Sequence, residues 1–138
     1  HRELEALAVP ATPALVEVNS SRAALQLLQH DIARADDSVT LLAPAEAFPL
    51  LVPTFRRPAS RGVTLRLFSV GAVASPALDV TEVPAPDAWP GVPLCCVVDG
   101  RSALVASRSG NEVVGHWSSA PTIIAAARLT IDALTRTA

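Results

Sequence analysis

Apolar residues recur in two rhythms along the first half of the chain. Spacings of three and four residues, which gather side chains on one side of a helix, predict helices over about 20–35 and 48–60. Short β-branched segments predict strands around 16–18 and over 38–43 and 63–68. Helices that alternate with strands in this way are typical of a parallel sheet covered by helices.

Polar residues and prolines set the limits of these two helices. One of the polar residues 19–21 can cap the first helix, because a side-chain oxygen there accepts a bond from a free amide of the first turn. The second helix contains Pro49, Pro53 and Pro58. Each proline removes a hydrogen-bond donor and crowds the preceding turn, so we expect an irregular helix at best.

The second half of the chain has a different organisation. Residues 75–93 are rich in proline and contain one short candidate edge strand between Leu78 and Val83. Three strands joined by tight turns are predicted after it, over 94–98, 102–107 and 112–117. Asp99 and Gly100 form a typical two-residue hairpin turn, so these strands should be antiparallel.

The last predicted element is a helix that starts near residue 119. Ser119 is the expected cap, and Pro121 falls in the first turn, where a missing amide costs nothing. Its expected buried stripe contains Ile123, Ile124, Ala127, Ile131 and Leu134. The whole pattern predicts an α/β fold with a mixed parallel and antiparallel sheet between helices.

The composition excludes several kinds of chemistry. The chain has 138 residues, enough for one domain, and all 11 of its basic residues are arginine. Without lysine there can be no Schiff-base enzyme, no phosphate-loop lysine and no lysine general base. A net charge of −2 also argues against a surface that itself grips nucleic acid.

The remaining composition suggests a cytoplasmic protein. No apolar segment approaches the ~18 residues of a membrane span. Cys95 and Cys96 are adjacent, so they do not make a disulfide framework, and we expect them to pack in the core. A mean hydropathy of +0.37 suggests that some apolar surface is buried against a partner. We interpret residues 1–14 as a linker, with the end of a helix from an absent upstream part, and 15–138 as the domain.

Four segments, taken in order, resemble one known family. They read ADDSVTLLAP, RGVTLRLF, PLCCVVDGRSALVAS and GHWSSAPTIIAAARLTIDAL, of which VVDGRSALVAS and HWSSAP are the most specific. In this order they resemble the phospholipase D-like domain, and more closely its non-enzymatic form in TrmB-type bacterial transcriptional regulators. The resemblance covers roughly 16–136, and it implies the phospholipase D-like version of the α/β fold.

The catalytic signature of that family is degenerate in this chain. The signature is H-x-K-x4-D followed by G-S-x-N, with the histidine as nucleophile and the lysine holding the phosphate. If Asp99 is the aspartate, the histidine and lysine positions fall on Val92 and Leu94. The second part falls on 106–109, where only Ser107 matches. We therefore expect no catalytic residue and no cofactor, and we interpret Asp99 as a structural turn residue.

The resemblance implies a role in sensing. In TrmB-type relatives this domain binds a small effector, often a sugar, contributes to dimerisation, and follows a separate DNA-binding helix-turn-helix domain. We accordingly expect a homodimer that responds to a sugar or sugar-like molecule and reaches DNA only through such a separate domain. Arg56, Arg57 and Arg61 form a small basic cluster that is either a solvated helix end, an anion-binding surface or a surface close to DNA.

Five residues are candidates for contacting the effector. They are Glu46, Ser69, Ser107, His116 and Trp117. Glu46 and Ser69 are expected in loops at the carboxyl ends of parallel strands, where open α/β sheets place their ligands. His116 and Trp117 point to opposite faces of a strand, so only one should enter a given cleft. The alternative is that Trp117 packs under the final helix while His116 is solvated.

Three further possibilities stay open. Trp89 lies in the proline-rich segment as either a lid, an interface anchor or a plug on the core. A divergent hydrolase or transferase could use Ser107 and His116, although no catalytic triad can be assembled from the sequence. The domain could also be a dimerisation module with a filled cleft and no ligand. No residue spacing is typical of a metal site.

Overall fold

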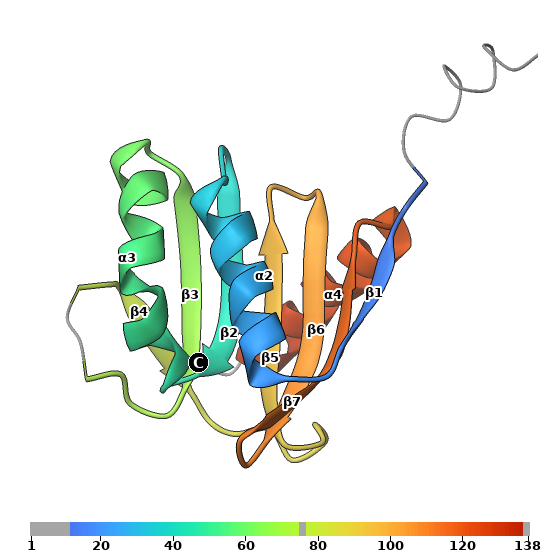
Figure 1. Ribbon diagram of the computed structural model, residues 1–138. Helices are drawn as coiled ribbons and strands as arrows, with labels where there is room; N and C mark the ends of the chain where they lie inside the picture. Colours follow the sequence, from blue (N-terminus) through green and yellow to red (C-terminus); the bar gives the residue numbers. More distant parts are fainter. Residues whose placement is uncertain (1–11, 75–76, 137–138) are drawn as a thin grey trace, which may run out of the picture.

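Seven strands form one mixed sheet in the order β1-β7-β6-β5-β2-β3-β4 (Figure 1). The structure is a computed structural model that describes residues 12–74 and 77–136. The strands are β1 Leu15–Val18, β2 Ser38–Pro44, β3 Thr64–Val70, β4 Val80–Val83, β5 Val92–Val98, β6 Ser102–Ser109 and β7 Glu112–Ser118. Residues 1–11 of the predicted linker, with its expected helix end, lie outside the described residues.

The sheet joins a parallel part to an antiparallel part, as the sequence predicts. β2, β3 and β4 are parallel, whereas β5, β6, β7 and β1 follow in antiparallel pairs. The join is the antiparallel pair of β2 and β5, which places two almost wholly buried strands at the centre. The predicted edge strand is β4, at one end of the sheet.

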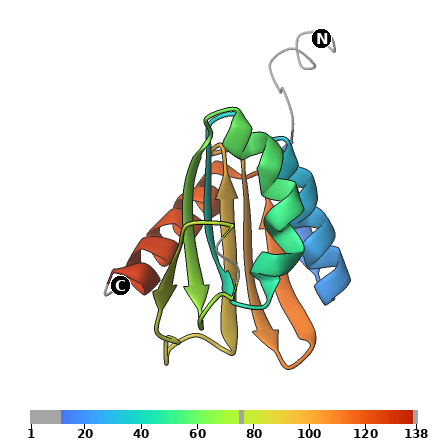
Figure 2. The same ribbon diagram turned by 90° about the vertical axis from the view of Figure 1, so that its left-hand side faces the viewer.

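Three helices cover the two faces of the sheet (Figure 2). They are α2 Ser21–Ala33, α3 Ala47–Ser60 and α4 Pro121–Thr135. α2 and α3 lie side by side on one face and α4 lies on the other, so each face has its own core. Among the described residues, no helix is both long and apolar enough to cross a membrane.

α2 confirms the first predicted helix. Ser20 is the N-cap, and its hydroxyl accepts a 3.0 Å hydrogen bond from the Ala23 amide. Ala24, Leu28 and Ile32 repeat at helical spacing and are buried against the sheet. The cap and the stripe together explain why the chain turns into a helix here.

α3 is a continuous helix, so the prediction of an irregular one was wrong. Pro49 falls in the first turn, where its missing amide has no helical partner to lose, and Pro53 and Pro58 lie inside the helix. An internal proline costs about 3 kcal/mol or more. The helix also buries Phe48 and Phe55 completely, and burial of each such side chain contributes about 1.5–3 kcal/mol. Leu51 belongs to the same buried stripe, and tertiary packing of the whole stripe acts against the cost of the prolines.

Cys95 and Cys96 are both core residues, as predicted. Cys95 faces α4 and Cys96 faces α2 and α3, and both are free thiols. Burial raises the pKa of Cys95 to about 12, against a smaller lowering from a hydrogen bond with the Ala106 backbone. Burial also raises the pKa of Cys96, helped by the nearby negative charge of Asp31.

The Asp99–Gly100 turn fastens the β5–β6 hairpin to the start of β2. Both turn residues have left-handed backbone angles, with φ of 56° and 65°. The Asp99 carboxylate accepts hydrogen bonds from the amides of Asp36, Asp37 and Ser38, at 2.7 to 3.2 Å. These contacts agree with the interpretation of Asp99 as a structural residue.

The start of α4 differs from the prediction that Ser119 is its cap. The N-cap is Ala120, which has no side chain to cap with, and Pro121 is in the first turn. The Ser119 hydroxyl instead accepts a 2.9 Å bond from the Ala14 amide. The Ser118 hydroxyl donates to the Ala14 carbonyl, so both serines hold the residue that leads into β1. The Ser119 hydroxyl therefore holds the residue before the edge strand β1 and does not cap α4.

Candidate functional site

The degenerate motif positions lie at one end of β5, on the face that α2 and α3 cover. Leu94 and Cys96 belong to the core of that face, and Val92 shares it by strand alternation. Arg108 on β6 lies directly opposite Val92 in the register, and Ala106 lies opposite Leu94. The register therefore brings Arg108 to the place where the family motif would put its histidine and lysine.

A cleft of about 380 Å³ opens at this end of the sheet, between α2, α3 and the strands. We call it the motif cleft. Its lining residues are Ser21, Arg22, Ala24, Leu25, Leu28, Pro44, Glu46, Ala47, Leu50, Leu94, Arg108 and Val113. Most of them are aliphatic, so the cleft has apolar walls with a few charged groups, the usual character of a small-molecule site.

Arg108 and Glu46 form an ion pair in the cleft. The Arg108 Nη1 atom lies 2.7 Å from Glu46 Oε1. The arginine side chain is 29% exposed and the glutamate 71%, so the cation is the more deeply placed partner. The hydrogen bond from Arg108, with one from the glutamate's own backbone, lowers the pKa of Glu46. Arg108 Nε is buried without a hydrogen-bond partner among the described residues.

Two helix starts add to the positive character of the motif cleft. α2 begins at Ser21 and α3 at Ala47, and both residues line the cleft. Backbone amides at a helix start carry partial positive charge. Glu46 is the N-cap residue of α3 but makes no side-chain cap, because its carboxylate is turned to Arg108. Arg108 and the two helix starts together favour an anionic group.

Of the five predicted ligand contacts, only Glu46 lines the motif cleft. It directly precedes α3 at the carboxyl end of β2, as expected. Ser69 is not in a loop, so that prediction was wrong: it is a buried residue of β3, and its hydroxyl donates to the Gly71 carbonyl at 2.7 Å. Ser107 is next to Arg108 but points to the α4 face, because successive strand residues alternate.

His116 and Trp117 lie on opposite faces of β7, as predicted. His116 is exposed on the side of α4. Trp117 is half-buried on the side of α2, where its indole nitrogen donates to Asp31 at 2.8 Å. The alternative that Trp117 packs under the final helix was therefore wrong, because α4 covers the other face. Trp89 is half-buried against the α4-side core and donates to the Ala106 carbonyl at 3.3 Å, so it is a plug.

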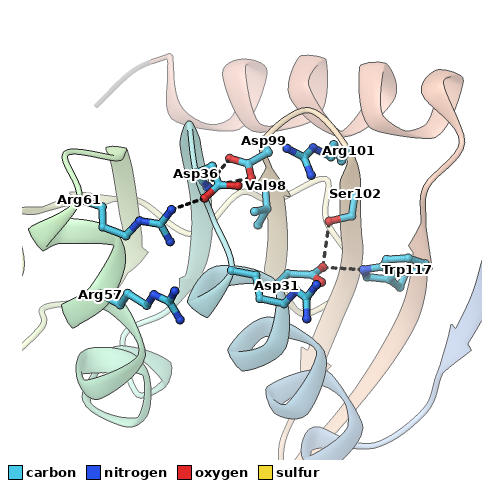
Figure 3. A pocket seen from close by; sticks show the side chains of 10 residues that line it. Asp31, Asp36, Arg57, Arg61, Val98, Asp99, Arg101, Ser102 and Trp117 are labelled. Atoms are coloured by element: carbon cyan, nitrogen blue, oxygen red, sulfur yellow. Dashed lines mark hydrogen bonds and ion pairs between the residues drawn. The ribbon is translucent and has the colours of Figure 1, made fainter.

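Trp117 belongs to a second cleft at the opposite end of the sheet (Figure 3). We call it the polar cleft. It has a volume of about 600 Å³ and is lined by Asp31, Arg34, Asp36, Arg57, Arg61, Val98, Asp99, Arg101, Ser102 and Trp117. Its side chains come from the ends of α2 and α3, from the segment before β2, from the β5–β6 turn and from β7, and several of them point toward one another.

Much of the charge in the polar cleft has a structural use. Asp31 accepts hydrogen bonds from Ser102 and Trp117, at 2.9 and 2.8 Å, and Asp36 pairs with Arg61 at 2.8 Å. Arg34 and Arg61 are the C-cap residues of α2 and α3, where a cation offsets the negative helix end. Arg61 thus fits the interpretation of the basic cluster as a helix end, and we take the motif cleft as the candidate site.

Arg108 is the residue that sequence reasoning missed. It occupies the unspecified position of the G-S-x-N segment, so motif matching gave it no role. The signal was present in the strand pattern: Arg108 has the same parity as Ala106, and the Asp99–Gly100 hairpin fixes which residues of β5 they face. Pairing the strands through that turn places Arg108 beside Val92 and Leu94.

No family model and no curated protein matches the chain, but several solved structures share its fold. NucT from Helicobacter pylori has a TM-score of 0.69 at 14% identity, over 89% of this chain and 96% of that one. Nuc from Salmonella typhimurium, a phospholipase D family member, has a TM-score of 0.63 at 14% identity, over 89% and 94%. TrmBL2, an archaeal chromatin protein, has a TM-score of 0.68 at 12% identity. This chain covers 57% of TrmBL2, and 94% of this chain is matched. The fold is therefore the phospholipase D-like α/β fold.

Proposed function

We propose that this chain is a non-catalytic effector-binding domain that holds a small molecule in the motif cleft. One observation carries the proposal. A cleft of about 380 Å³ persists where the family motif would sit, but Val92 and Leu94 occupy the motif positions, and the cation is Arg108. Aliphatic side chains can neither attack phosphorus nor hold a phosphate, whereas a lined cleft with one cation can bind a ligand.

The hydrolase alternative has less support. Ser107 and His116 share the α4 face, and the register makes them diagonal neighbours across β6 and β7. Neither residue lines the motif cleft or the polar cleft. A nucleophile and its base need hydrogen-bond contact and a place for the substrate, and neither of the two described clefts offers such a place beside Ser107 and His116.

The wider proposal is that the domain belongs to a cytoplasmic transcriptional regulator. TrmBL2 is an archaeal chromatin protein whose structure shows a novel mode of DNA binding, and this chain covers 57% of it. The net charge of −2 of this chain is a poor match for DNA phosphates, so the proposal assigns DNA contact to a separate helix-turn-helix domain. Effector binding would shift the population of domain arrangements and so change DNA affinity.

A homodimer is part of the same proposal. β1 is an edge strand, and Leu15 and Val16 on it are 66% and 44% exposed. Exposed aliphatic side chains beside the free edge of a sheet favour contact with a second copy.

Thermal unfolding in the presence of a compound library tests the proposal. The library should contain sugars, sugar phosphates, nucleotides and organic acids. We expect at least one class to raise the melting temperature, and we expect Leu25→Trp, which fills the cleft with a larger uncharged side chain, to abolish that shift. If no compound moves the melting temperature while the protein stays dimeric, the domain is a dimerisation module. Turnover of phosphodiesters or esters that is lost in Ser107→Ala/His116→Ala would instead establish the enzyme alternative.

A further inference from the structure

We infer that the ligand of the motif cleft is an amphipathic acid: one carboxylate on a compact apolar body. This inference rests on the proposed function and specifies its ligand. The class differs from the sugar that the sequence resemblance suggests. Three observations support it: Arg108 has a donor without a partner, the walls of the cleft are apolar, and the carboxylate of Glu46 is exposed.

Arg108 has an unused donor that points to a carboxylate ligand. Its Nη1 atom is bonded to Glu46, but Nε is buried and has no hydrogen-bond partner among the described residues. A buried polar group without a partner is unfavourable, and a guanidinium presents its donors as a planar fork that matches the two oxygens of a carboxylate. Because Nε is buried while Nη1 is held by Glu46, a ligand carboxylate would reach it once Glu46 leaves and the guanidinium turns toward the cleft, and it would then accept hydrogen bonds from Nε and a terminal nitrogen.

The walls of the motif cleft call for an apolar body. Leu25 and Leu28 of α2, Leu94 of β5 and Val113 of β7 form them. A sugar ring would bring hydroxyl groups against these side chains, and each hydroxyl would lose hydrogen bonds to water without regaining them. An alkyl chain or a benzene ring would bury apolar surface instead. At about 30 Å³ per water-sized unit, the cleft holds roughly a dozen heavy atoms.

Glu46 holds the guanidinium that the ligand carboxylate would bind. It is 71% exposed, so it can turn into solvent at little cost, since ion pairs at the surface contribute little to stability. The two helix starts at Ser21 and Ala47 add positive character that remains when Glu46 leaves. Binding would then exchange one carboxylate on Arg108 for another, and a negative ligand and Glu46 would compete.

Calorimetric titration with matched probes tests the inference on the full chain. Octanoate and octanamide have the same chain length and differ in charge, and glucose and glucose 6-phosphate represent sugars and their anions. We expect octanoate to bind at least tenfold more tightly than octanamide, and neither sugar to bind detectably. Arg108→Gln should weaken octanoate binding at least tenfold. Glu46→Gln should tighten it about threefold, because it removes the competing carboxylate.

A matched control separates the cleft from general charge effects. Arg34→Gln removes a guanidinium from the polar cleft and should leave octanoate binding unchanged. Circular dichroism at the working temperature confirms that each variant is folded. Equal binding of octanoate and octanamide, or octanoate binding that Arg108→Gln leaves intact in a folded protein, would overturn the inference.

The failure of this inference and that of the proposed function give different results. If glucose or glucose 6-phosphate binds, Leu25→Trp abolishes that binding, and octanoate does not bind, the acid inference is wrong and the sensing proposal stands. If no probe and no library compound binds, both are wrong.

Discussion

At the residue scale, Asp99 and Leu94 fall at two positions of the family motif, and different physical reasons explain the residue found at each. Asp99 would be the motif aspartate, and its retention is explained by three backbone amides that it holds and by a turn that needs a left-handed residue. Leu94 falls at the lysine position and is a buried member of the cleft wall. The fold thus depends on Asp99, whereas it accepts an apolar residue at Leu94.

The contacts of Asp99 predict a pH-dependent loss of stability. Partial burial works to raise the pKa of the carboxyl, but the amides of Asp36, Ser38 and Asp37, with nearby Arg101, outweigh it and lower the pKa. A carboxyl with a lowered pKa in the folded state stabilises above its unfolded pKa of about 3.9, and that contribution is lost as the pH falls through the folded value. We expect Asp99→Asn, which tolerates the left-handed turn, to cost about 1.5–3 kcal/mol at pH 7.

Urea unfolding at pH 7 and at pH 3 measures this effect. The difference in the free energy of unfolding between the wild type and Asp99→Asn should be larger at pH 7 and should become smaller as the pH falls. Asp79→Asn is the control, because Asp79 is exposed and outside the turn. An equal gap at both pH values would mean that the charge of Asp99 contributes nothing.

The two cysteines provide a second prediction at this scale. Burial raises the pKa of both thiols, to about 12 for Cys95, so almost no thiolate is available at pH 8. We expect an aromatic disulfide reagent to leave the native protein unmodified and to titrate two thiols in guanidinium chloride. Rapid labelling of the native protein at pH 8 would show that β5 opens to solvent.

At the scale of the elements, the sequence predicts most of this fold because period and turn chemistry are local. The order of strands and helices, the Ser20 cap and the Asp99 hairpin follow from neighbouring residues alone. The continuous helix α3 could not be predicted in this way, since burial of Phe48 and Phe55 in the core that α3 shares with α2 and the sheet decides it.

The candidate site was less predictable than the fold. Glu46 was found from its position after a strand, but Ser69 was placed beyond a strand that continues to Val70. Strand ends are hard to locate because the last residues are held by a neighbouring strand, here β4. The place of Arg108 in the cleft depends on the reach of its long side chain and on the pairing register of β5 and β6, and neither can be read from a motif pattern.

β7 contains a glycine, Gly115, at a position that has no room for a Cβ atom. A Cβ atom at Gly115 would overlap the Val105 carbonyl oxygen and Ala106 on the neighbouring strand β6. Overpacking of this kind costs about 1–3 kcal/mol and sometimes more, so Gly115→Ala should lower stability by at least about 3 kcal/mol because backbone must move.

Chemical denaturation of Gly115→Ala beside Gly110→Ala separates crowding from backbone preference. Gly110 has φ of 63° in a turn, and a Cβ there would meet nothing within 4 Å. Its replacement should cost only the left-handed penalty of about 1–2 kcal/mol. If both variants lose the same stability, the β6–β7 pair is looser than its register implies.

At the scale of the whole molecule, the two faces of the sheet have different uses. The face under α2 and α3 carries both clefts, one at each end of the sheet, while the face under α4 buries Cys95, Val97 and Ile131. β1 stands at the far edge from β4, on the antiparallel side, and carries exposed aliphatic residues. A partner bound along the β1 edge would therefore not cover the motif cleft, which opens between α2, α3 and the strands.

The proposed homodimer can be tested at that edge. Leu15→Glu adds a charge beside the free edge of β1 and should raise the dimer dissociation constant at least tenfold, because an unpaired charge at an interface is unfavourable. Leu129→Glu is the matched control, since Leu129 is 70% exposed on α4, a helix that packs mainly against β5 and β6. Sedimentation velocity over a range of concentrations measures both variants. Dissociation by Leu129→Glu alone would move the interface to α4, and a wild type that is monomeric at every concentration would remove dimerisation from the proposal. Because surface changes of this kind alter stability by only about 0.5 kcal/mol, a lost dimer with an unchanged monomer would assign the effect to the interface.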